Sequence, residues 1–280
     1  MIKKKILVGI SAVVLLSGCS TIAEFTGNDS ATLNLNAAED YKALIADAKT
    51  QKALDTSSST YKRVNAVYQR MLPFADEANK TGQKFDWQLA VIKSNEVNAF
   101  VVPGGKVVVF TGIVNNLKLT DAEIAAVMGH EITHALEEHA KSKIGAQALT
   151  KLAVDAGKTY AGDKLGSMGS QAVDFGSKYG VGLPYSRSLE SRADRGGLML
   201  MAKSGYDPEA AVSVWKKMNQ LDSSSNNGVA RFTSTHPSNN ARIEDLNKSM
   251  AEAKVLYASS NKATVTGTKT KTVKKAKKSK

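Results

Sequence analysis

The chain has 280 residues, of which 42% are hydrophobic, and a formal net charge of +12 at pH 7. That length and hydrophobic content suit one sizeable folded domain or two small ones and exclude a chain that is disordered throughout. The charge lies at the two ends: residues 3–5 hold three lysines and residues 262–280 hold eight, which leaves 27 basic against 26 acidic residues elsewhere. A body this close to neutral argues against nucleic acid as a partner.

The first 19 residues have the pattern of an export signal. Lysines precede an apolar run at residues 6–16, which is too short to cross a bilayer as a stable helix and is typical of a signal peptide. Leu-Ser-Gly-Cys at residues 16–19 resembles the lipobox of bacterial lipoproteins, which implies removal of residues 1–18 and lipid on Cys19. An ordinary secretory signal or a short membrane anchor is the alternative.

Lipid on Cys19 would make the membrane a partner, because two or three acyl chains hold a protein stably on a bilayer. By the same resemblance, Ser20 after the cysteine favours the periplasmic face of the outer membrane. Cys19 is the only cysteine, so an internal disulfide is excluded.

Residues 19–38 are rich in Ser, Thr, Asn and Ala, and this composition predicts a tether between lipid and domain. Apolar residues at helical spacing then predict helices over residues 39–54 and 59–80, the second broken near Pro73. Residues 87–93 have the composition of a strand.

Residues 98–110 predict a β-hairpin, because β-branched runs flank Gly104 and Gly105. Within it, Asn98, Ala99 and Phe100 are candidates for substrate binding, since an extended peptide can pair with the exposed edge of a sheet. A purely structural strand is the alternative, because extended edges are common.

The most informative stretch spans residues 120–139. Thr120 and Glu123 have the spacing of a capping box, so a helix is expected from residue 121 onward. His130 and His134 are four residues apart and project from one face of that helix, as two ligands of a tetrahedral zinc must. Glu131 lies beside them and can take a proton from a zinc-bound water. The alternative is a chance pair of histidines with a solvated glutamate.

His139 lies nine residues after His130, which on an ideal helix turns it by about half a revolution from the metal face. We therefore leave His139 out of the predicted site.

A third ligand is available downstream. Glu190 and Asp194 are again four residues apart on one face of a predicted helix, so Glu190 can complete a His, His, Glu site for one zinc ion per chain. Asp194 can accept the second N–H of a ligating histidine. His236 is a candidate to hydrogen-bond the oxyanion of the reaction or to contact the metal in a closed state, with a capping or packing role as the alternative. Arg242 fits a surface ion pair better than a role in the site.

The remaining segments are less specific. Residues 141–178 predict either a helical hairpin or a mobile lid, residues 208–221 and 243–256 predict helices, and residues 222–228 predict a polar loop. The lysine-rich segment 259–280 is expected to be disordered, with either a solvated state or a contact with anionic envelope components.

Four motifs in order resemble the M48 family of zinc metallopeptidases. They are Asn-Ala-Phe with Pro-Gly-Gly at 98–105, His-Glu-Ile-Thr-His at 130–134, Glu-Ser-Arg-Ala-Asp at 190–194, and Ser-Thr-His-Pro at 234–237 with the arginine at 242. The likeness covers roughly residues 40–258.

This resemblance implies an α+β, zincin-like (gluzincin) fold that is mostly helical, with a small mixed or antiparallel sheet beside the metal helix. It implies one domain over residues 39–258, with zinc on His130, His134 and Glu190 and with Glu131 as general base. Some members of the family act in outer-membrane protein quality control, and several carry a TPR module, but this chain has no 34-residue repeat. The four-transmembrane branch is excluded, because no apolar run after Cys19 approaches 18 residues.

Together these features predict a lipid-anchored zinc endopeptidase that acts on misfolded or unassembled envelope proteins. A chaperone or assembly factor that keeps the zinc fold with little proteolysis is the first alternative. An adaptor that binds through its lysine-rich tail is the second.

Overall fold

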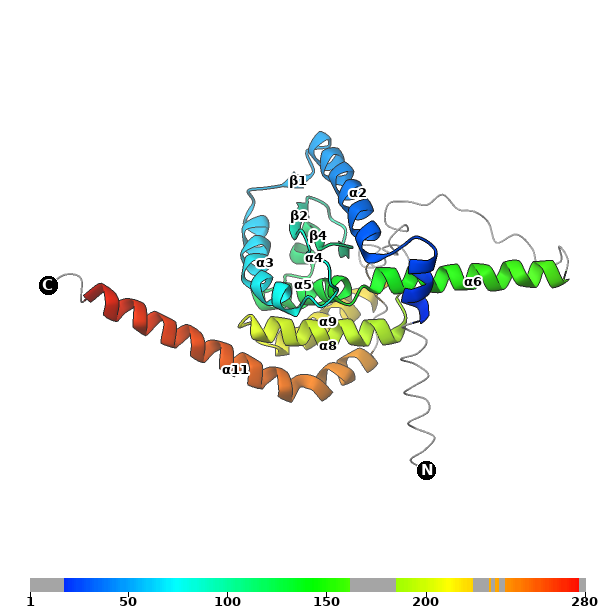
Figure 1. Cartoon of the computed structure of the whole chain (residues 1–280). Coiled ribbons are helices and arrows are strands. Elements are labelled where there is room, and N and C mark those ends of the chain that lie inside the picture. The colour runs from blue at the N-terminus through cyan, green and yellow to red at the C-terminus, as the bar shows by residue number, and fades with distance from the viewer. Residues whose placement is uncertain (1–17, 162–184, 224–231, 233–234, 237–239, 277–280) are drawn as a thin grey trace, which may run out of the picture.

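The computed structural model describes residues 18–161, 185–223, 232, 235–236 and 240–276. The helices in that part of the chain surround a small four-stranded sheet (Figure 1). The strands are β1 (Leu54–Asp55), β2 (Gln88–Ile92), β3 (Ala99–Val102) and β4 (Lys106–Phe110). The principal helices are α2 (Ser30–Thr50), α3 (Ser59–Ala78), α4 (Thr111–Asn116), α5 (Asp121–Leu136), α6 (His139–Ala161), α8 (Arg187–Lys203), α9 (Glu209–Ser223) and α11 (Asn240–Ala276). The predicted fold class, mostly helical with a small mixed sheet, is confirmed.

The sheet has the strand order β1-β2-β4-β3, so β3 forms one edge. Strand β2 runs parallel to β4, whereas β3 pairs with β4 in an antiparallel hairpin whose turn places Gly104 and Gly105 at φ +77° and +83°. These positive φ values are the reason that glycine is needed at the turn, and the predicted hairpin is confirmed.

The sheet is buried on both faces because its strands alternate between two apolar clusters. In β3, Ala99 and Val101 belong to the large cluster formed with α3, α5 and α8, whereas Phe100 and Val102 pack against α2 on the opposite face. This two-residue alternation is the pleat of a strand. The edge strand β3 therefore lies next to α5, with its inward side chains covered on each face.

Helices α5 and α8 approach each other closely at two glycines. A Cβ added to Gly129 would lie 2.8 Å from the carbonyl oxygen of Gly197, and one added to Gly197 would lie 2.6 Å from the backbone nitrogen of His130. Only residues without a side chain fit this crossing. Helix α11 packs on the far side of α8 and then extends away from the body (Figure 1).

The structure differs from the tether predicted at residues 19–38. Residues 18–25 are helical, and α2 begins at Ser30, where the side chain of Asp29 caps it. Leu33, Ala37 and Tyr41 recur every four residues and are buried against the sheet, with exposed fractions of 4%, 0% and 4%. The polar composition of this segment concealed that stripe, so the folded unit extends further toward the N-terminus than residue 39.

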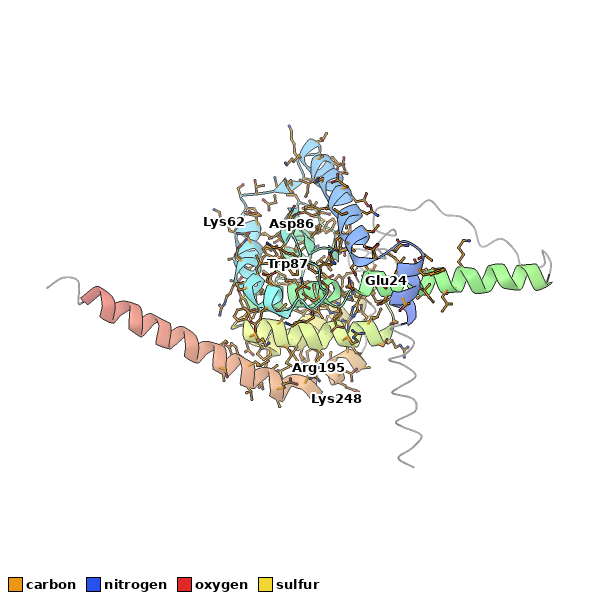
Figure 2. All side chains as sticks on the ribbon, viewed as in Figure 1. Glu24, Lys62, Asp86, Trp87, Arg195 and Lys248 are labelled. Carbon is orange, nitrogen blue, oxygen red and sulfur yellow. The ribbon has the colours of Figure 1, made fainter. Side chains whose placement is uncertain are left out.

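The N-terminal helical segment is attached to the start of α6. The ammonium of Lys141 donates to Glu24 at 2.5 Å and to Ser30 at 3.0 Å, and the hydroxyl groups of Ser20 and Ser142 are 3.1 Å apart. Figure 2 labels Glu24 on this segment, where it meets α6. The Cys19 carbonyl lies so close to Gly145 that a Cβ there would overlap it.

Two further predictions differ from the structure. Helix α3 continues through Pro73, because buried residues before and after it, including Met71 and Ala75, fix the helix to the core. Helix α11 continues to Ala276, through most of the segment 259–280 that was expected to be disordered. That segment contains no proline, and its eight lysines and two alanines are good helix formers, whereas its five threonines, two valines and Gly267 are poorer ones.

The other predicted elements are reproduced by β2, α9 and the first half of α11. Part of the predicted lid, residues 162–178, and residues 224–228 of the predicted loop lie outside the described residues. Among the helices that are described, none combines the length and apolar content required to cross a membrane.

Candidate metal centre

Four side chains from three parts of the chain converge in the interior. His130 and His134 come from α5, Glu190 from the first turn of α8, and His236 from the segment before α11. All four are buried, with exposed fractions of 5% or less. Their potential ligand atoms all lie within 4.8 Å of one another.

Four of the distances between these atoms are close to those between neighbouring ligands of one ion. The Nε2 atom of His130 lies 3.0 Å from Nε2 of His134 and 3.1 Å from Nδ1 of His236, and Oε1 of Glu190 lies 3.0 Å from Nδ1 of His236 and 3.4 Å from Nε2 of His134. Metal–ligand bonds of about 2.0–2.1 Å in a tetrahedron separate neighbouring ligand atoms by about 3.3 Å.

The hydrogen bonding of His130 indicates that a cation belongs between these atoms. Its Nδ1 lies 3.0 Å from Oδ1 of Asp194. A carboxylate only accepts, so Nδ1 carries the hydrogen and Nε2 presents its lone pair to the cluster. That lone pair faces a second imidazole nitrogen at 3.0 Å, an arrangement that a bound metal ion stabilises. The donor set of imidazoles and one carboxylate suits zinc.

Local sequence explains how the helices present these groups. Both hydrogen bonds of the Thr120–Glu123 capping box are present at the start of α5, and Ser186 caps α8 one turn before Glu190. Each helix therefore begins at a defined residue, and the close glycine crossing brings His130 and Glu190 to the same place.

A buried arginine holds the two carboxylates of α8. Arg242 donates to both oxygens of Asp194 at 2.6 and 2.7 Å, contacts Oε2 of Glu190 at 2.6 Å, and lies over the ring of Trp215 at 3.6 Å. Burial raises the pKa of Asp194, but Arg242 and His130 outweigh it and lower that pKa. The predicted surface ion pair for Arg242 is wrong, because the residue is only 4% exposed.

Glu131 lies beside the cluster with the environment of a base. It is 2% exposed, and its Oε1 atom has no hydrogen-bond partner among the described residues. Burial raises the pKa of Glu131 above its ordinary value. Its Oε1 lies 3.6 Å from Nε2 of His236. A carboxylate in this position can accept a proton from a molecule held between it and the ligand atoms.

Two aromatic rings close the cluster from the remaining side. Tyr185 stacks on His134 with ring centroids 4.2 Å apart, and Phe232 stacks on His236 at 4.8 Å. From the sequence alone, His236 could have a structural role, contact the oxyanion or contact the metal. In the structure its Nδ1 lies 3.1 Å from Nε2 of His130 and 3.0 Å from Oε1 of Glu190, among the other potential ligand atoms.

The residues predicted to bind substrate are buried, with exposed fractions of 8% or less, and do not join the cluster. Ala99 and Phe100 are on the edge strand β3, and the amide of Asn98 donates to Glu96 at 3.1 Å. A hollow runs between the end of β3 and the ends of α2 and α5, and His134 and Tyr185 line it together with Val101 and Leu33. The edge strand and the histidine cluster therefore share one hollow.

His139, which helical geometry excluded from the predicted site, lies next to it. Helix α5 ends at Leu136, and Glu138 adopts φ +49°, so the helix is interrupted before α6 begins at His139. His139 is fully buried, with its Nδ1 2.8 Å from Nδ1 of His134. His139 is not one of the four clustered ligand residues, so its exclusion as a metal ligand stands. Its contact with His134 was not foreseen, because the helix does not continue and no glycine or proline in residues 134–139 signals its end.

The fold and the centre define a class: a zincin-like metallopeptidase fold with two histidines of one helix and a glutamate of another at a buried metal centre. The peptidase family M48 model matches residues 58–250, and the chain belongs to this family. The family resemblance expected from the four motifs is thereby confirmed.

Several characterised proteins are similar to this chain. The mitochondrial metalloendopeptidase OMA1 of Schizosaccharomyces pombe is 40% identical over 169 residues, which cover 60% of this chain and 48% of that protein. The metalloprotease LoiP of Escherichia coli is 28% identical over 78% of this chain and 86% of its own length. The beta-barrel assembly-enhancing protease of Yersinia pestis is 27% identical over 60% of this chain and 35% of its own length. The chain spans about half the length of the OMA1 protein that it matches.

Proposed function

We propose that the protein is a zinc-dependent endopeptidase of the bacterial cell envelope, attached through lipid on Cys19 to the periplasmic face of the outer membrane. Its substrates are misfolded or unassembled envelope proteins. The observation that carries the proposal is the convergence of His130, His134 and Glu190, with ligand atoms 3.0–3.4 Å apart, beside the buried carboxylate of Glu131. Similarity to a bacterial metalloprotease over 86% of that protein's length supports the peptidase activity, and similarity to a beta-barrel assembly-enhancing protease supports the envelope setting.

In this proposal His130, His134 and Glu190 hold one zinc ion, and Asp194 orients His130. Zinc, when bound, polarises a carbonyl group and lowers the pKa of a water molecule to about 7. Glu131 accepts the proton of the attacking water as the new C–O bond forms, and it returns that proton to the amine as the peptide C–N bond breaks. Asn98, Ala99 and Phe100 present the edge of β3 to the backbone of the substrate.

Glu131→Gln tests the reaction. The variant should contain as much zinc as the unmodified protein but digest unfolded casein about 10²–10⁴-fold more slowly, the usual contribution of a general base. A chelator should abolish the digestion by both proteins. Unchanged digestion by Glu131→Gln, with zinc content preserved, would show that the assignment of Glu131 is wrong.

His236 requires its own test, because four protein ligands leave no coordination position for a substrate. If the position of His236 beside the other ligand atoms represents a closed state in which it binds the metal, His236→Ala should digest casein faster than the unmodified protein. If His236 instead donates to the oxyanion, the same variant should be slower.

The anchor is tested separately from the reaction. Metabolic labelling with a radioactive fatty acid should mark the protein in a bacterial host, and Cys19→Ala should remove the label and release the protein from outer-membrane fractions. Labelling that survives Cys19→Ala would contradict the anchoring site.

Because the whole cluster is buried, a chaperone or assembly role with little proteolysis is the second candidate function. If Glu131→Gln restores envelope assembly in a strain that lacks the protein, proteolysis is not its main role. If the variant fails while the unmodified protein succeeds, the endopeptidase proposal stands.

A further inference from the structure

We infer that His139, backed by Glu137 and Arg192, is a positioning residue that holds His134 in the tautomer and orientation of a metal ligand. The inference rests on the proposed metal centre and adds residues that the four family motifs do not contain. It concerns how tightly the metal is held, and it is therefore tested by metal binding and not by proteolysis.

The contacts form a continuous series of hydrogen bonds and one ion pair that leads away from the cluster. Nδ1 of His134 lies 2.8 Å from Nδ1 of His139, Nε2 of His139 lies 3.1 Å from Oε2 of Glu137, and the same Oε2 lies 2.5 Å from the guanidinium of Arg192. His139 is fully buried, whereas the side chain of Arg192 is 45% exposed. The series thus connects a buried ligand with a charge at the surface.

Each link of this series has one consistent direction. Glu137 only accepts, so Nε2 of His139 carries a hydrogen and Nδ1 of the neutral ring is an acceptor. Nδ1 of His134 must then be the donor across the 2.8 Å contact, which leaves the lone pair of His134 Nε2 directed into the cluster. The opposite direction would put a hydrogen on the atom that has to bind the metal.

The other ligating histidine has the same kind of support. Nδ1 of His130 contacts Asp194, and Asp194 is paired with Arg242. Both histidines are therefore held through Nδ1 by a carboxylate that an arginine balances, directly for His130 and through the ring of His139 for His134. Carboxylates behind ligating histidines orient them and strengthen metal binding, and their loss costs typically 10–100-fold in affinity.

The backbone explains why His139 is needed to connect His134 with Glu137. Glu137 follows the last residue of α5, and the break in the helix at Glu138 lets the side chain of His139 contact that of His134. The ring of His139 lies between His134 and Glu137. Its Nδ1 accepts a hydrogen bond from His134, and its Nε2 donates one to Glu137. Arg192, on the second turn of α8, pairs with Glu137 and so links the end of α5 to the helix that carries Glu190.

Zinc affinity of the full chain, measured by competition with a chromophoric chelator, tests the inference. His139→Leu removes the acceptor, so zinc should bind about 10–100-fold more weakly. His139→Asn has nearly the same size as the leucine variant but places an amide oxygen where Nδ1 was, and it should recover most of that loss. Glu138→Gln is the matched control, because this neighbouring carboxylate pairs with Lys141 at 3.8 Å and not with His139; its affinity should be unchanged.

A second variant covers the case in which His139→Leu does not fold, which urea denaturation of the chelator-treated protein will show. Glu137→Gln keeps the shape of the side chain but removes its charge, and it should also weaken zinc binding. The inference is overturned if His139→Leu and Glu137→Gln both bind zinc as tightly as Glu138→Gln, or if a folded His139→Asn binds as weakly as His139→Leu. Because these readouts do not involve peptide cleavage, failure of the endopeptidase proposal would be seen separately, in Glu131→Gln.

Discussion

Replacing Arg242 by methionine should destabilise the metal-free protein strongly. Arg242 is the cation that balances two carboxylates, Asp194 at 2.6 Å and Glu190 at 2.6 Å, and both carboxylates are buried. Methionine preserves much of the apolar stem of the side chain but leaves these two negative charges beside each other without a counterion.

The expected size follows from that geometry. Removing one partner of a buried ion pair costs about 3–5 kcal/mol, because the other charge stays buried and unbalanced. Loss of the contact of Arg242 with the Trp215 ring, at 3.6 Å, adds to this. Zinc supplies positive charge to Glu190, so added zinc should recover part of the loss, and zinc should stabilise Arg242→Met more than it stabilises the unmodified protein.

Urea denaturation of the chelator-treated chain, followed by circular dichroism, measures the effect. Arg195→Met is the matched control, because Arg195 reaches from α8 toward α11 and pairs with Glu252 at 2.9 Å while remaining 60% exposed (Figure 2). Exposed pairs contribute about 0–1 kcal/mol. If the two variants lose equal stability, the carboxylates are not balanced by Arg242 as the structure indicates, and the reasoning fails.

Three further outcomes are expected. Gly197→Ala should separate α5 from α8, because its Cβ would lie 2.6 Å from the backbone nitrogen of His130, and should lower stability by about 1–3 kcal/mol together with zinc affinity, both measurable on the purified chain. Thr120→Ala should cost about 1 kcal/mol in urea denaturation through loss of its hydrogen bond to Glu123, with zinc affinity preserved. Zinc at about 1,000 times its dissociation constant should add about 4 kcal/mol to the free energy of unfolding, and the gain should disappear with chelator; an unchanged unfolding curve would argue against a metal centre.

The sequence predicted the parts of the molecule whose signals are local. The capping box before α5, the glycine turn between β3 and β4, and the four-residue spacing of His130 and His134 each depend on residues close together in the chain. Such signals can be interpreted without knowledge of the remaining fold. The fold class also followed, because it was tied to these motifs by family resemblance.

What the sequence did not predict depends on contacts between distant segments. The burial of Arg242 requires α8 and α11 to meet, and the apolar stripe of α2 is recognisable only once a sheet face exists for it to cover. His139 was missed for a different reason: an ideal helix was extended past Leu136, whereas a single left-handed residue, Glu138, ends it. A non-glycine residue with positive φ carries little sequence signal.

If Cys19 carries lipid, the attachment of residues 18–30 to α6 would set the distance between the metal centre and the membrane. The acyl chains would then emerge next to Gly145, and no flexible linker would separate them from the helix that starts at His139. The peptidase would then stand at a constant height above the bilayer, and it would meet only those polypeptides that come within that layer. Proteins further from the membrane would have to diffuse to it, because a folded attachment takes the place of the flexible linker that the amino-acid composition had predicted.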